Sequence, residues 1–173
     1  PAPDIMAEHG VNDYLFAKRK AAERFGVLDG SVLPRNTEIE EALAGHPAVA
    51  FVGAIGQPDA FSGELPCAYV ELVKDGKTTA EELLAYAKDR IGERAAVPKL
   101  IEIVEELPKT AVGKIFKPDL RRKAIRRVFD DTLAHAGLAA RVAEVVEDKK
   151  RGLVARIDRT GDVDEAAVAA KMG

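Results

Sequence analysis

The sequence predicts an α+β protein: a small three-stranded antiparallel sheet flanked by helices, with an extra β-hairpin and helix at the C-terminal end. Three observations support this fold class. Two runs rich in Val, Ile, Tyr and Phe, residues 48–55 and 67–73, are separated by a loop with glycine and proline, which indicates an antiparallel pair of strands. The Thr-x-x-Glu spacing at Thr37 and at Thr79 is typical of a helix-capping box. A third short run, residues 99–104, supplies the remaining strand.

Start and stop signals place the helices between these strands. Proline cannot donate a backbone hydrogen bond and disfavours a helical residue before it, so Pro47 marks the end of the helix that begins near Thr37. A proline in the first turn with an acid beside it, Pro118 and Asp119, favours the start of a long helix. The expected helices are residues 12–25, 37–44, 79–91, 118–135 and a short one after Asp162, and the expected C-terminal hairpin pairs residues 142–146 with 153–157.

The composition is that of a globular protein with a real core. The chain has 173 residues, of which 47% are hydrophobic and 32% charged, enough for one ordinary domain with an arm or a decorated end. The net charge is -3, and acidic and basic residues are mixed along most of the chain, which argues against a nucleic-acid surface. One stretch differs, because residues 114–127 hold seven basic side chains and one acidic one. This stretch is either a patch for a small phosphorylated ligand or a solvated helix face.

Cysteine use and hydropathy point to the cytoplasm. Cys67 is the only cysteine, so no internal disulfide is possible and a reducing compartment fits. It lies in an apolar run, where a packed thiol is expected. No apolar run approaches the ~20 residues that cross a bilayer, and the first residues lack the basic and apolar regions of a signal peptide. His46 has no second His or Cys at ligand spacing, so we expect no metal site.

Residues 107–117 form the loop best suited to carry chemistry. Pro108 stiffens its start, Gly113 permits a backbone conformation closed to other residues, and Lys114 follows at once, so that one ammonium group is presented at a fixed place. A glycine before a lysine also occurs in the phosphate-binding P-loop, but that motif requires a hydroxyl side chain after the lysine, where this chain has Ile115. From these residues alone, a structural turn is as good an interpretation as a functional loop.

Five short motifs, in order and with characteristic spacing, change that balance. They are Glu38-Ile-Glu-Glu41, His46-Pro-Ala-Val49, Gly56-Gln-Pro-Asp59, Gly63-Glu64-Leu-Pro66 and Leu107-Pro-Lys-Thr-Ala-Val-Gly-Lys-Ile115. The stretch from about Glu38 to Arg122 resembles the small C-terminal domain, or lid, of the adenylate-forming enzymes, which include acyl-CoA synthetases, luciferases and the adenylation domains of peptide synthetases. On this resemblance we expect three parts: an N-terminal helical arm and joint (1–33), the lid domain (34–137), and a hairpin and helix extension (138–173).

The resemblance implies a two-step reaction. A carboxylate attacks the α-phosphorus of ATP to give an acyl-adenylate and pyrophosphate, and the thiol of CoA then displaces AMP. Lys114 stands at the position of the family's catalytic lysine, which neutralises the charge that develops at the phosphate in the first step. The neighbouring positions to which we assign loop positioning and phosphate contacts in the cofactor site are Pro108, Lys109, Thr110, Gly113 and Lys117.

The resemblance also implies a partner. In this family a large N-terminal domain of the same enzyme holds most of the ATP with its Mg²⁺ and selects the carboxylic acid. Nothing in the present sequence resembles that domain. We therefore expect the lid of an AMP-forming acyl-CoA synthetase, an acid–thiol ligase with fatty acid metabolism as its setting, inactive without the large domain. Two alternatives stay open: a free-standing regulatory module with the lid fold that binds a nucleotide or an acyl carrier, and a purely structural interaction domain.

Overall fold

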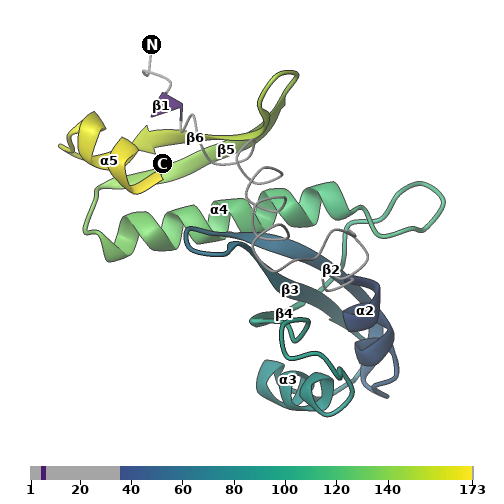
Figure 1. Cartoon of the computed structure of the whole chain (residues 1–173). Coiled ribbons are helices and arrows are strands. Elements are labelled where there is room, and N and C mark those ends of the chain that lie inside the picture. Colours follow the sequence, from purple (N-terminus) through teal and green to yellow (C-terminus); the bar gives the residue numbers. More distant parts are fainter. Residues whose placement is uncertain (1–4, 7–35, 173) are drawn as a thin grey trace. The chain divides into compact units, whose positions relative to one another are not determined.

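The computed structural model of the chain describes residues 5–6 and 36–172 (Figure 1). The helix predicted at 12–25 lies outside these residues. The described residues form two compact units. The first unit comprises residues 36–57 and 64–121, and the second comprises residues 5–6, 58–63 and 122–172. The domain boundaries expected near residues 33 and 137 stay predictions.

The first unit is built on a three-stranded sheet in the order β2-β3-β4. Its strands are β2 (Val49–Asp59), β3 (Gly63–Leu72) and β4 (Leu100–Val104). A three-residue connection joins β2 to β3, so these strands form an antiparallel hairpin. The α+β class and the three strands are confirmed. One pair differs from the all-antiparallel sheet that we expected, because β4 runs parallel to β3, with Cys67 opposite Leu100 and Glu71 opposite Val104. The long connection between them contains a helix, which returns the chain to the end at which β3 begins.

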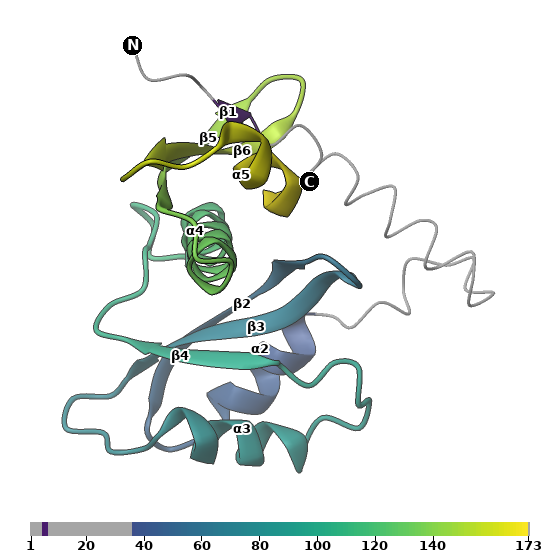
Figure 2. The ribbon, with the colours of Figure 1, turned by 90° about the vertical axis from the view of Figure 1, so that its left-hand side faces the viewer.

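Helices α2 (Asn36–Ala44) and α3 (Ala80–Lys88) cover one face of this sheet (Figures 1 and 2). Ile39 of α2 and Leu83 of α3 are fully buried in a core that also contains Val52 of β2. Gly53 points to the opposite face of β2, where an added Cβ would lie 2.5 Å from Cδ1 of the buried Leu120. Both faces of β2 are therefore covered by apolar side chains.

One of the two predicted capping boxes is formed. Thr79 is the N-cap of α3: its hydroxyl accepts from the N–H of Glu82 at 3.2 Å, and the Glu82 carboxylate accepts from the N–H of Thr79 at 3.0 Å. The box predicted at Thr37 is wrong, because α2 begins before that residue, at Asn36. The carboxylate of Glu40, its expected partner, bonds instead to groups distant in the sequence.

The second unit contains the predicted C-terminal hairpin and helix. β5 (Ala140–Asp148) and β6 (Gly152–Arg159) pair antiparallel, and α5 (Glu165–Met172) follows. A short strand that we did not predict, β1 (Ile5–Met6), adds to the other edge of β6, with Ile5 opposite Ile157. The unit has its own buried core, made by Ile125, Leu133, Val142, Ala155, Ile157 and Val168.

Helix α4 (Lys117–His135) starts within one residue of its predicted start and ends where predicted. Its residues up to Arg121 belong to the first unit and the rest to the second. In the second unit, Asp130 accepts from the N–H of Val142 at 2.6 Å, and Arg126 donates to the carbonyl of Ala143. The register of β5 shifts at this point. The helix side chains thus bond backbone groups of β5 where the ladder is irregular.

The cap of α3 provides a test of the fold. Thr79→Ala removes the hydroxyl that accepts from Glu82, so one amide at the start of the helix loses its partner. We expect the free energy of unfolding to fall by about 1 kcal/mol, measured by urea denaturation. Thr79→Ser keeps the hydroxyl and is the matched control. Equal losses in the two variants would show that the hydroxyl does not cap the helix.

Candidate functional site

The loop between β4 and α4 folds into a narrow hairpin. Lys109 and Ile115 form an antiparallel bridge across it. Beside them, the N–H of Phe116 donates to the carbonyl of Pro108 at 2.7 Å. These contacts hold the two sides of the loop together below its tip.

Thr110 closes the tip. Its N–H donates to the carbonyl of Lys114 at 2.7 Å, and its carbonyl accepts from the N–H of Gly113 at 2.8 Å. Its hydroxyl accepts from the N–H of Lys114 at 3.2 Å. Gly113 has a φ of +79°, in the left-handed region that side chains disfavour. The backbone of Lys114 is therefore fixed by two hydrogen bonds to Thr110, and the glycine before it is held by a third.

The side chain of Lys114 is exposed at this tip. Within residues 36–172, its ammonium group has no hydrogen bond or ion pair. Val112, on the same tip, is 81% exposed. The loop thus offers a positive charge to the outside from a closed backbone turn.

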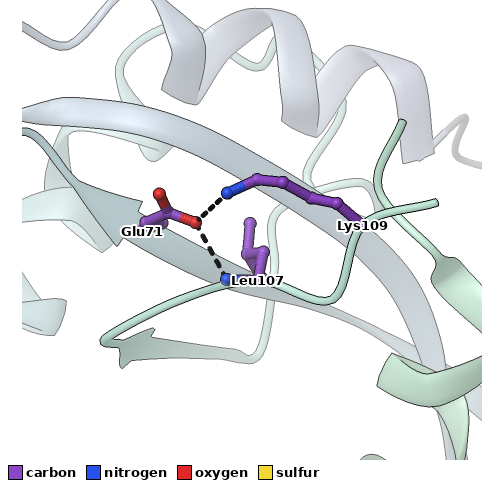
Figure 3. A network of polar contacts seen from close by, with 3 residues as sticks. All are labelled: Glu71, Leu107 and Lys109. Carbon is purple, nitrogen blue, oxygen red and sulfur yellow. Dashed lines mark hydrogen bonds and ion pairs between the residues drawn. The ribbon is translucent and has the colours of Figure 1, made fainter. Parts of the chain in front are cut away.

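A carboxylate on β3 holds the base of the loop (Figure 3). One oxygen of Glu71 accepts from the N–H of Leu107 and from the ammonium of Lys109, both at 2.8 Å. Burial tends to raise the pKa of Glu71, but the hydrogen bonds from Leu107 and Lys109 outweigh it and lower the pKa below its ordinary value. The Lys109 ammonium also lies 4.3 Å from the centre of the Phe51 ring. Lys109 is therefore occupied on two sides by groups of its own unit.

A second carboxylate holds the chain where the loop passes into α4. An oxygen of Glu40 lies 2.8 Å from the ammonium of Lys117 and accepts from the N–H of Ala54, also at 2.8 Å. The loop from 107 to 117 contains three lysines, and two of them are paired with carboxylates. Of the residues that the sequence singled out, Pro108, Thr110 and Gly113 shape the turn, while Lys109 and Lys117 anchor it at its two ends.

Glu64 has an unusual environment that the sequence did not reveal. Its side chain lies across Gly56 on the neighbouring strand, so that a Cβ added to the glycine would be 1.6 Å from the carboxyl carbon. Burial raises the pKa of Glu64 to about 7, against an opposing effect of the positive charge of Arg121. Both residues of this contact belong to the motifs quoted above, but the only sequence signal is a glycine on one strand, which does not identify the side chain that covers it.

Neither a metal centre nor a membrane-spanning helix occurs among residues 36–172. No three His, Cys, Asp or Glu side chains lie close enough together to hold an ion, and no helix is long and apolar enough to cross a bilayer. Nδ1 of His46 accepts from the N–H of Ala48 at 3.2 Å, and its ring contacts Tyr86 edge-on. Cys67 is fully buried, which confirms the packed thiol.

Comparison with known proteins finds relatives of the segment that forms this loop and sheet. Residues 38–114 match the family described as AMP-binding enzyme C-terminal domain. The marinolic acid–CoA ligase of Pseudoalteromonas sp. (strain SANK 73390) is 39% identical over 127 residues, 69% of this chain and 18% of the ligase. The long-chain-fatty-acid–CoA ligase of Bacillus subtilis (strain 168) is 45% identical over 87 residues, 50% of this chain and 15% of the ligase. A solved fatty acyl CoA synthetase of Mycobacterium tuberculosis covers 49% of this chain and 16% of its own, with 33% identity and a TM-score of 0.45.

Residues 38–114 are an AMP-binding enzyme C-terminal domain. The resemblance inferred from the five motifs is thereby confirmed. The chain spans less than a fifth of the length of the two ligases named above. The AMP-binding enzyme C-terminal domain includes the whole three-stranded sheet, α3 and the loop tip as far as Lys114, whereas α4 and the hairpin of the second unit follow the matched residues.

The raised pKa of Glu64 predicts a pH-dependent stability of this domain. Because the pKa is about 7 in the folded state and 4.5 ordinarily, the folded state binds the proton more tightly, and the stability falls as pH rises between these values. We expect Glu64→Gln to be more stable than the wild type above about pH 7, with a difference that shrinks toward about pH 5. Urea denaturation across this range measures it, with the exposed Glu81→Gln as control. A difference that is constant with pH would contradict the burial of the charge.

A comparison of two glycines separates the backbone strain at the loop tip from steric clashes of an added side chain. A Cβ added to Gly113 or to Gly92 meets no described atom within 4 Å, but only Gly113 has a positive φ. We expect Gly113→Ala to be less stable than Gly92→Ala by about 1 kcal/mol, because only the first forces a side chain into the left-handed region. Thermal unfolding of the two variants gives this difference. Equal stability would mean that the turn relaxes at no cost.

Proposed function

We propose that this domain is the lid of an AMP-forming acyl-CoA synthetase and that Lys114 is its catalytic residue. The observation that carries the proposal is the exposed ammonium of Lys114, with no partner in the described part of its own chain, at the tip of a loop closed and anchored by hydrogen bonds. The two relatives named above are acid–CoA ligases, which supports this class of reaction.

In the first step an oxygen of the carboxylate attacks the α-phosphorus of ATP. The bond from that phosphorus to the bridging oxygen breaks, pyrophosphate leaves with the electron pair, and an acyl-adenylate remains. Attacker and target are both anionic, so their approach requires a cation held between them. The lysine ammonium is a compact charge on a flexible stem and can contact oxygens of both groups.

In the second step the sulfur of CoA attacks the carbonyl carbon of the adenylate. The thiol proton is released to solvent, and AMP leaves with its phosphate oxygen as the product thioester forms. Lys114 serves the first step, and the lid moves it away before the second. Other parts of the complete enzyme would select the carboxylic acid and complete the CoA site. We propose that this enzyme acts in fatty acid metabolism in the cytoplasm.

We propose that a large N-terminal domain holds the acid and most of the ATP. Mg²⁺ would be bound there with the phosphates, whose charge it neutralises. The isolated chain is then inactive and contributes one cation to a site built by other residues. Calorimetric binding of CoA or AMP to the isolated chain would instead favour a free-standing nucleotide-binding module.

Removal of the Lys114 charge tests the proposal. In the complete enzyme that carries this domain, we expect Lys114→Ala to slow adenylate formation by about 10²- to 10³-fold, the loss typical of one electrostatic contact to a transition state. Pyrophosphate release in a single turnover measures this step. Thioester formation from preformed acyl-adenylate should stay at the wild-type rate.

The matched control is Lys74→Ala, which removes an exposed lysine from the turn after β3. It should leave both steps unchanged. Wild-type adenylate formation by Lys114→Ala would overturn the assignment of the catalytic residue.

A further inference from the structure

We propose that Glu71 is a positioning residue for adenylate formation, acting through Lys109 and Leu107 on the loop that carries Lys114. This inference rests on the proposed function and deepens it. It assigns Lys109 to the loop anchor and not to a phosphate of the substrate.

Glu71 stands at the point where the loop leaves the sheet. In the parallel register it lies opposite Val104, the last residue of β4. Leu107 follows three residues later and is 1% exposed. The carboxylate of Glu71 therefore captures the chain at its first buried residue after the strand, through a backbone N–H at 2.8 Å.

The same oxygen captures the Lys109 ammonium at 2.8 Å. The side chains of Lys109 and Glu71 are only 23% and 15% exposed. A charged donor to a carboxylate makes a stronger bond than a neutral one, and the partly buried setting screens it less than an exposed surface would. The Phe51 ring on a further side of the ammonium adds a cation–π contact. These contacts keep the ammonium group of Lys109 against Glu71 and Phe51 of its own domain.

The connection from Lys109 to Lys114 is short and bonded throughout. The backbone bridge pairs Lys109 with Ile115, the residue after Lys114. Thr110, the residue after Lys109, makes three hydrogen bonds to Gly113 and Lys114. A shift of Lys109 therefore displaces the tip as a whole. Misplacement of a catalytic group by about 1 Å can reduce a rate by about 10²-fold.

The experiment compares variants of this anchor in the complete enzyme. Glu71→Gln keeps the shape of the side chain and removes its charge, and Lys109→Met removes the ammonium and keeps the chain length. We expect each to lower the rate constant of adenylate formation by about 10- to 100-fold, with less than about a twofold change in the KM for ATP. Thioester formation from preformed adenylate should be unchanged, which a general loss of folding would not allow.

Two further variants distinguish an anchor from a phosphate contact. The double variant Glu71→Gln/Lys109→Met should lose no more than either single variant, because both remove the same interaction. Lys109→Arg, which keeps the charge, should restore most of the rate. If Lys109 contacts phosphate instead, Lys109→Met will raise the KM for ATP while Glu71→Gln leaves adenylate formation at the wild-type rate, and the inference is overturned.

A measurement on the 173-residue chain tests the anchor without catalysis. In Glu71→Gln we expect hydrogen exchange to be faster at the bonded amides of Leu107, Thr110, Lys114 and Phe116 and unchanged in α3. Glu105→Gln, the same substitution at an exposed position just before the loop, is the matched control and should exchange like the wild type. Unchanged exchange in Glu71→Gln would overturn the anchor whatever the role of Lys114. Altered exchange together with a fully active Lys114→Ala enzyme would reject the proposed function and not the anchor.

Discussion

One carboxylate oxygen with two donors determines how the loop of residues 107–117 begins. Glu71 is partly buried, so its charge needs partners, and it finds them in the N–H of Leu107 and the ammonium of Lys109. Both donors come from the segment that leaves the neighbouring strand. The sheet therefore sets the direction of the loop through a charged contact. The same contact also positions the closed turn that follows.

The three lysines of the loop are chemically alike and differ only in surroundings. Lys109 and Lys117 each lie 2.8 Å from a carboxylate, and their charges are compensated within the first unit. Lys114 is raised away from the sheet by the turn that Thr110 and Gly113 close. An uncompensated charge at a fixed backbone position is the property that an electrostatic catalyst requires, because little reorganisation is needed when the charge of the reaction develops.

The second unit shows how a hairpin outside the family match is stabilised. It has a separate apolar core, and two side chains of α4, Arg126 and Asp130, bond the backbone of β5 where its register shifts. Backbone groups that an irregular ladder leaves without strand partners must be satisfied in some other way. The long helix that follows the loop of residues 107–117 thus also contributes hydrogen bonds to a structure outside the matched residues.

Local patterns in the sequence determined most elements and the position of the loop. Strands, helices and the cap at Thr79 follow from alternation, proline and hydroxyl placement, which act over a few residues. The Gly113–Lys114 turn was visible for the same reason. Tertiary structure alone decided the parallel pairing of β4, the partners of Glu40 and Glu71, and the burial that raises the pKa of Glu64. Each of these depends on which segments become neighbours in space, and charged side chains find partners tens of residues away that no short-range pattern specifies.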